Sequence, residues 1–200
     1  MATPSSPVSD RLRALDPEAL GRSVGEALLE HVARLIVPCA PGLTLRAAGD
    51  PAACGLALTA ADLCRYAQTG ALGDWEGAAD ALDAAQSVVE GVYSAPADRL
   101  LVRVEADAEG DRPPPWTAAI DLRTDLGLVL GSALVRAWAA TGASRVPAAW
   151  IGALLGVTDG RVRQWVTDGP LRAETVSDGT HRRSLVEPES VRQLLATRGL

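Results

Sequence analysis

The chain has 200 residues, of which 48% are hydrophobic and 22% are charged. This is enough apolar material for one or two folded domains with real cores, and it excludes a disordered protein. All 19 basic residues are arginine, so chemistry that depends on lysine, such as Schiff-base formation or a phosphate-binding P-loop, is excluded. The three cysteines form no C-x-x-C motif, and we expect small buried thiols rather than disulfides or a zinc ribbon.

The net charge of −6 is distributed unevenly along the chain. Residues 143–200 hold eight arginines against six acidic residues, a net charge of +2, whereas residues 1–142 carry −8. Such asymmetry indicates parts with different partners. We therefore predict a flexible tail over residues 1–15, which are rich in serine and proline, an α+β domain over residues 16–142 and a separate domain over residues 143–200.

The first predicted helix begins at Asp16, which is a typical N-cap, and continues through Pro17 at its first position. Pro38 lies beyond its expected end. The short apolar segments at residues 42–47 and 55–59 follow, and we interpret them as two strands around a loop rich in glycine and proline.

Two further helices and a strand pair are predicted next. One helix is expected from a Thr59 cap and another from an Asp74 cap. Residues 98–107 alternate apolar with charged side chains, and residues 116–123 are their expected partner strand across a turn-rich segment. The overall expectation is a mainly α fold with small β elements.

The segment from Thr124 to about Ala140 predicts a helix that is apolar on most faces and ends at Gly142. Such a helix must be buried, either within its own domain or against a second copy of the chain. We therefore expect a homodimer, with this helix as the candidate intersubunit surface.

Candidate catalytic and metal-binding patterns are weak throughout. His31 and His181 are far apart in the sequence, and acidic pairs such as Asp80 with Asp83 are typical of solvated helix faces. We expect no enzyme activity, no cofactor and no metal.

The longest apolar runs are shorter than a membrane span and the N-terminus lacks the order of a secretory signal, so we expect a cytoplasmic, nucleoid-associated protein without a membrane partner.

Residues 148–168 predict two short helices joined by a tight turn. The first helix spans residues 148–155, and Gly156 is suited to the left-handed conformation that ends it. Thr158 is a suitable N-cap for a second helix that begins at Asp159. This order is that of a helix-turn-helix.

The second of these helices is amphipathic. Val162 and Trp165 recur at helical spacing and are expected to face the core, which leaves Arg163 and Gln164 on the outer side and Arg161 at its flank. Arginine can bind guanine and glutamine can bind adenine through two hydrogen bonds each. This face is therefore chemically suited to the major groove of DNA.

A hairpin and a last helix are predicted after the helix-turn-helix. Two strands, at residues 171–176 and 181–186, are joined by the dipeptide Asp178–Gly179. A helix is expected from Pro188 that buries Val191, Leu194 and Leu195.

The spacing of Gly152, Gly156, Val162 and Trp165, together with the hairpin and final helix, resembles the winged helix-turn-helix domains of the mercury-resistance-regulator (MerR) and excisionase type. The resemblance covers about residues 145–200, and the family more often has alanine where Gly152 stands. It implies that the second helix enters the major groove and that the wing contacts flanking backbone or the minor groove. The expected DNA-binding residues are Thr158, Asp159, Arg161, Arg163, Gln164, Thr180, His181, Arg182 and Arg183.

The sequence thus favours a DNA-binding regulatory protein, similar to a transcriptional regulator, with double-stranded DNA as partner. Its helix at residues 159–167 would read bases and its wing at residues 171–186 would bind the backbone. Two alternatives stay open. One is an excisionase-like or partition-type architectural protein that bends or coats DNA, and the other is an adaptor whose winged domain binds protein.

Overall fold

The structure is a computed structural model, and it describes residues 7–36, 50–92, 113–114, 117, 120–178 and 181–198. These residues form mainly helices together with one small three-stranded antiparallel sheet of order β1-β3-β2, in agreement with the mainly α expectation. The elements are α1 (Pro7–Ala14), α2 (Pro17–Ile36), the 3-10 turn η1 (Pro51–Ala53), α3 (Gly55–Thr69), α4 (Ala78–Val92), α6 (Asp125–Thr141), β1 (Val146–Pro147), α7 (Ala148–Leu155), α8 (Asp159–Asp168), β2 (Ala173–Asp178), β3 (His181–Val186) and α9 (Pro188–Thr197).

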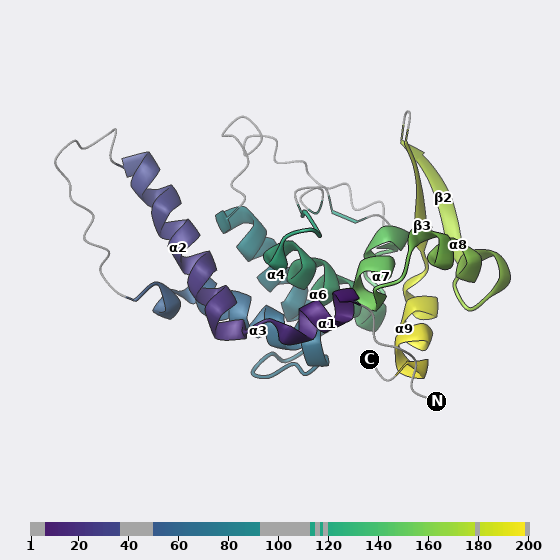
Figure 1. The fold of residues 1–200 in the computed structure, drawn as a ribbon, viewed down its shortest axis with the longest axis horizontal. Helices are drawn as coiled ribbons and strands as arrows, with labels where there is room; N and C mark the ends of the chain where they lie inside the picture. The colour runs from purple at the N-terminus through teal and green to yellow at the C-terminus, as the bar shows by residue number, and fades with distance from the viewer. Residues whose placement is uncertain are drawn as a thin grey trace.

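Helix α6 occupies the centre of the fold (Figure 1). The Thr124 hydroxyl caps its first turn by accepting the amide hydrogen of Gly127 at 2.9 Å, and Gly142 ends it in the left-handed conformation with φ 72°. Both boundaries agree with the prediction, because each depends on a local capping signal. Every residue from Gly127 to Ala139 is buried, as the apolar composition of this segment requires.

The core passes through α6 from one end of the molecule to the other. Helix α6 contacts α3 and α4 on one side and α7 and α9 on the other, and the buried side chains of all these helices form one cluster. Trp138 of α6 stacks on Trp150 of α7, with ring centroids 5.6 Å apart. The domain boundary predicted between residues 142 and 143 therefore falls at the end of a helix whose buried side chains pack on elements from both sides of that boundary. Ser144 and Val146, just beyond it, are buried.

Arg136 connects α6 to the end of α3. Its guanidinium is buried, with 8% of the residue exposed, and its Nε donates a hydrogen bond of 2.9 Å to the carbonyl oxygen of Ala67. That carbonyl lies in the last turn of α3, where backbone oxygens lack helical partners and the helix dipole favours a cation. Burial lowers the pKa of Arg136 from its usual value. The helix end thus supplies the polar contact that a buried cation needs.

Two glycines bring α2 against its neighbours. A Cβ added at Gly21 would lie 2.5 Å from the carbonyl oxygen of Ala57, and one at Gly25 would lie 2.1 Å from that of Pro51. Side chains larger than hydrogen do not fit at these distances, so the spacing of four residues between the glycines allows α2 to pack directly on the backbone of η1 and α3. As predicted, the helix begins after Asp16, whose carboxylate accepts the amide hydrogen of Glu18 at 3.0 Å.

The flexible tail predicted over residues 1–15 is wrong for residues 7–14, which form α1. Leu12 is 4% exposed, and the side-chain amide of Gln68 donates to the carbonyl oxygens of Leu12 and Leu15 at 2.9 and 2.8 Å. The serine- and proline-rich composition suggested a tail. The sequence gives no local sign of the residue that holds this segment in place, because that residue lies more than 50 positions further along the chain. Residues 1–6 lie outside the described residues.

Helix α3 begins earlier than predicted. Residues 55–59 are helical rather than a strand, and Cys54 is the N-cap, its Sγ accepting the amide hydrogen of Ala57 at 3.3 Å. Thr59, the predicted cap, lies inside the helix and donates its hydroxyl to the carbonyl of Gly55. The thiol cap was missed because cysteine is not among the usual capping residues. The other expected strand, residues 42–47, lies outside the described residues.

Helix α4 begins at Ala78 rather than after an Asp74 cap. The carboxylate that satisfies amides at this end belongs to Asp80, which accepts the amide hydrogens of Glu76 at 2.8 Å and Gly77 at 3.3 Å. Asp80, in the first turn, therefore takes the role that was expected of Asp74. Of the acidic pair Asp80 and Asp83, Asp80 thus has a structural role at the end of the helix.

The predicted strand at residues 116–123 is not formed where it can be described. Thr117 lies in a 3-10 turn, and its amide donates to the carbonyl of Pro114 at 3.0 Å. Residues 121–124 form a turn in which the Asp121 carbonyl accepts the amide hydrogen of Thr124 and its carboxylate accepts that of Arg123. These short-range bonds satisfy the backbone locally. Its expected partner, residues 98–107, lies outside the described residues.

Of the two kinds of burial expected for residues 124–140, within the chain or against a second copy, the structure shows the first. Leu130, Leu134 and Trp138 are 0–2% exposed within the single chain, because other helices of the chain cover them. Side chains this deeply buried do not contact a second copy, and the expected homodimer stays a prediction. Separately, none of the helices in the described ranges combines the length and apolar character needed to cross a lipid bilayer.

Candidate nucleic-acid interface

Helices α7 and α8 are joined by a turn with the predicted geometry. Gly156 has φ 59° and ψ 39°, the left-handed conformation that an L-residue with a side chain adopts only at a cost. Its amide donates to Ala153, and the amide of Val157 donates to the carbonyl of Gly152 at 2.9 Å. The Thr158 hydroxyl then caps α8 by accepting the amide hydrogen of Arg161. Local signals in the sequence were sufficient to predict this whole segment.

The inner face of α8 fixes the helix on the core. Val162 is 1% exposed and Trp165 is 7% exposed, in agreement with the expected pattern. The Trp165 ring also has two guanidinium groups over it, that of Arg198 at 4.5 Å and that of Arg161 at 5.6 Å from the ring centroid. Arg198 was missed in the sequence, because it follows α9 and no local pattern connects it with α8. It adds a cation–π contact that ties the end of the chain to this helix.

The outer face of α8 is polar and exposed. Arg161, Arg163 and Gln164 all lie on the surface, and Arg161 donates a hydrogen bond of 2.6 Å to the side-chain oxygen of Gln164. Arg163 has no side-chain hydrogen bond or ion pair in the part of the chain that the structure describes. Thr158 is exposed but its hydroxyl is occupied as the cap, and the side chain of Asp159 lies outside the description.

Strands β2 and β3 form the predicted hairpin with a shifted first strand. Strand β2 covers residues 173–178 instead of 171–176, because Leu171 is buried in the core at 1% exposure and its amide donates to the carbonyl of Trp165. Asp178 pairs with His181 across the ladder, so Asp178 belongs to the strand rather than to the turn. Gly179 lies outside the described residues.

Among the hairpin residues that were expected to contact DNA, Arg183 is the one whose side chain the structure describes. Arg183 is exposed in β3, opposite Val176. His181 and Arg182 have a place in the register of β3, but their side chains, and all of Thr180, lie outside the described residues. The structure therefore places a basic side chain in the hairpin that follows α8, and α8, the hairpin and α9 lie at the same end of the molecule (Figure 1).

The charges of this end are mixed but include several exposed arginines. Arg172, immediately before β2, is exposed, as are Arg183 and the two arginines of α8. Among the acids, Glu174 forms an ion pair with Arg145, and Asp168 is exposed at the end of α8. Arg172 was not among the predicted contact residues, although its position directly before the wing is a signal that could have suggested it.

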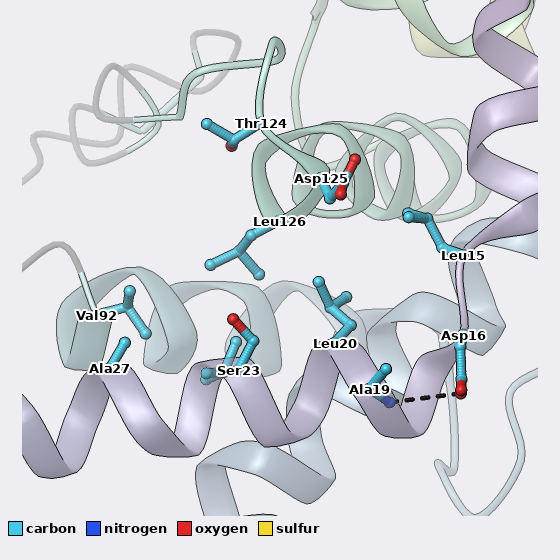
Figure 2. A pocket seen from close by; sticks show the side chains of 11 residues that line it. Leu15, Asp16, Ala19, Leu20, Ser23, Ala27, Val92, Thr124, Asp125 and Leu126 are labelled. Atoms are coloured by element: carbon cyan, nitrogen blue, oxygen red, sulfur yellow. Dashed lines mark hydrogen bonds between the residues drawn. The ribbon is translucent and has the colours of Figure 1, made fainter.

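A separate groove of about 430 Å³ lies between α2, the end of α4 and the beginning of α6 (Figure 2). Its lining is mostly apolar, and its two carboxylates already have partners. Asp16 accepts backbone amide hydrogens from Ala19 and Glu18, which hold the pKa of this carboxyl below its usual value, and Asp125 accepts from Arg11 at 2.8 Å. Across the described residues, no group of three or more His, Cys, Asp or Glu side chains could hold a metal ion.

Comparison with known proteins adds no further assignment: no family model, no curated protein and no solved structure matches the chain.

Proposed function

We propose that this protein is a DNA-binding regulatory protein whose helix α8 enters the major groove of double-stranded DNA while the β2–β3 hairpin contacts the backbone as a wing. The observation that carries the proposal is the exposed face of α8, where Arg161, Arg163 and Gln164 extend from a helix fixed by a buried tryptophan. A recognition helix needs both properties, a rigid base and outward side chains able to bind base edges.

The arrangement of the neighbouring elements supports the same function. A left-handed glycine turn and a threonine cap set α8 against α7, and the hairpin that follows carries the exposed Arg183. This order agrees with the resemblance to winged helix-turn-helix domains of the MerR and excisionase type. Arginine on a wing can contact phosphate or the minor groove, which positions the protein without reading sequence.

The charge distribution agrees with binding that depends on salt. Residues 143–200 have a net charge of +2 in a chain with a net charge of −6, so this part of a single copy would neutralise few phosphates. Because phosphate neutralisation supplies most non-specific affinity, we expect modest binding by a single copy and stronger binding if two copies occupy a palindromic site. The homodimer is thus retained as part of the proposal, without α6 as its interface.

The direct test is binding of the full chain to duplex DNA, with two arginine variants that remove the same charge. Arg163→Ala should weaken binding to a duplex selected from a random pool by about 1–3 kcal/mol and relax the sequence preference. Arg192→Ala is the matched control, because Arg192 is exposed on α9 and forms an ion pair with Glu189. We expect this variant to keep the affinity of the wild type.

Arg183→Ala separates backbone contact from base reading. It should weaken binding to all duplexes alike and reduce the slope of affinity against salt by about one. If the wild-type chain fails to bind duplex DNA at low salt, or if Arg163→Ala and Arg192→Ala behave identically, the proposal is wrong and the adaptor function becomes the better explanation. Footprinting distinguishes a regulator, which protects one compact palindrome, from an architectural protein, which protects an array of repeats.

A further inference from the structure

We infer that Arg161 and Gln164 act as one unit that recognises guanine, so that α8 selects a G·C pair at the position where these two side chains meet the DNA. The inference rests on the proposed DNA-binding function and makes it more specific. It changes the expected role of Gln164, since glutamine by itself is suited to adenine.

The two side chains are coupled on the surface of α8. They are three residues apart, which places them as neighbours one turn apart on a helix. The Arg161 guanidinium donates to the Oε1 atom of Gln164 at 2.6 Å and also lies 5.6 Å from the ring centroid of Trp165. It is thus in contact with two side chains of its own helix before any ligand arrives. The coupled pair is presented to solvent as one group.

The hydrogen bond determines which groups the pair can offer to a base. To bind adenine through two hydrogen bonds, Gln164 would accept from the N6 amino group with Oε1 and donate to N7 with its amide nitrogen. Oε1 has two lone pairs, and Arg161 occupies one of them and places its positive charge beside the other. An amino group that approached Oε1 would therefore meet this positive charge, whereas the amide hydrogens of Gln164 and the other N–H groups of Arg161 are available to an acceptor. The pair therefore presents donors next to a positive charge.

Among the base edges in the major groove, guanine is the one that matches such a pair. Guanine offers two neighbouring acceptors, O6 and N7, whereas adenine offers one acceptor beside an amino donor, thymine one acceptor beside a methyl group, and cytosine an amino donor. The amino groups of adenine and cytosine would face donors and a positive charge. Guanine alone offers two neighbouring acceptors to the donors of the pair, without an amino group that faces the positive charge.

Arg163 is not part of this unit. It lies two residues from Arg161 and one from Gln164, separations at which helical side chains do not face each other, and it has no side-chain partner within the described part of the chain. Arg163 is therefore free to contact a different base or a phosphate. This difference supplies an internal comparison, because replacing Arg163 should not alter the preference that Arg161 and Gln164 create.

The experiment selects binding sites from a random duplex pool with the full wild-type chain and with Arg161→Ala, Gln164→Ala and Arg163→Ala. We expect one guanine position in the wild-type site whose enrichment falls about tenfold with either of the first two variants. Arg163→Ala should lower the overall affinity and the preference at another position, while the enrichment of this guanine is retained. All three side chains are exposed, and circular dichroism checks that each variant is folded.

A second measurement uses the selected duplex with that guanine replaced by 7-deazaguanine, which lacks the N7 acceptor. The wild type should lose about tenfold in affinity, and Arg161→Ala and Gln164→Ala should lose little more than they have already lost. Enrichment of adenine at the position that depends on Gln164, or equal binding to all sequences, would overturn the inference and leave DNA binding intact. Absence of any duplex binding would instead overturn the proposed function.

Discussion

Replacement of Trp138 by alanine should destabilise both ends of the molecule together. Trp138 is 2% exposed and stacks on Trp150. Burial of a tryptophan removes roughly 150–250 Å² from water, which at about 25 cal/mol per Å² corresponds to roughly 4–6 kcal/mol. Alanine retains a small part of this burial, so we expect the free energy of unfolding to fall by about 3–5 kcal/mol.

Native-state hydrogen exchange can measure this effect separately in α3 and in α9, which both contact α6. If the chain unfolds as one unit, the slowest amides of both helices should lose about two to four orders of magnitude in protection. Trp75→Ala is a useful comparison, since Trp75 is only partly buried, packs edge-on against Tyr66 and should cost less. Loss of protection in α9 with full retention in α3 would refute the reasoning, because residues 143–200 would then unfold independently.

Three further predictions concern local features of the fold. Gly25→Ala should lower the free energy of unfolding by about 1–3 kcal/mol in urea denaturation, because its Cβ would lie 2.1 Å from the carbonyl oxygen of Pro51. Gly160→Ala should instead raise the free energy of unfolding by about 0.5–1 kcal/mol, because a Cβ fits at this position without a close contact. Thr158→Ala removes the cap of α8 and should cost about 1 kcal/mol in the same assay; an unchanged midpoint would contradict the capping role. Burial raises the pKa of the Cys64 thiol from 9.0 to about 11. As the pH rises, the thiol therefore loses its proton in the unfolded state before it does so in the folded state, and the free energy of unfolding should fall between about pH 9 and 11. Cys64→Ala should flatten that part of the pH profile, and an identical profile in both proteins would contradict it.

The elements that the sequence predicted well are those whose boundaries depend on residues within one helical turn. The Asp16 and Thr158 caps and the left-handed Gly142 and Gly156 were all predicted from residue type and spacing. The same local logic failed at Cys54, where a thiol serves as the cap. Propensity and capping rules describe short-range bonds, so they work where those bonds decide the structure.

Long-range contacts account for the remaining differences, both in the fold and in the candidate site. Helix α1 is held by Gln68 of α3, and its own composition gives no sign of that partner. On the candidate interface, the bounds of α8 followed from the pattern, but the contact of Arg198 with Trp165 and the hydrogen bond from Arg161 to Gln164 depend on how side chains meet in three dimensions. The residue types were predictable, and their pairing was not.

The shared position of α6 also limits how this chain can be recombined with others. A fragment transferred from residue 143 onward would carry α7 and α9 without the helix that covers them, and would expose an apolar surface that includes part of the Trp150 ring. A fragment that begins before Thr124 would keep α6 and its cap, but it would expose the side chains of α6 that α3 and α4 cover. For protein engineers, the central helix therefore ties the two ends of this molecule together, and they should be transferred as a whole.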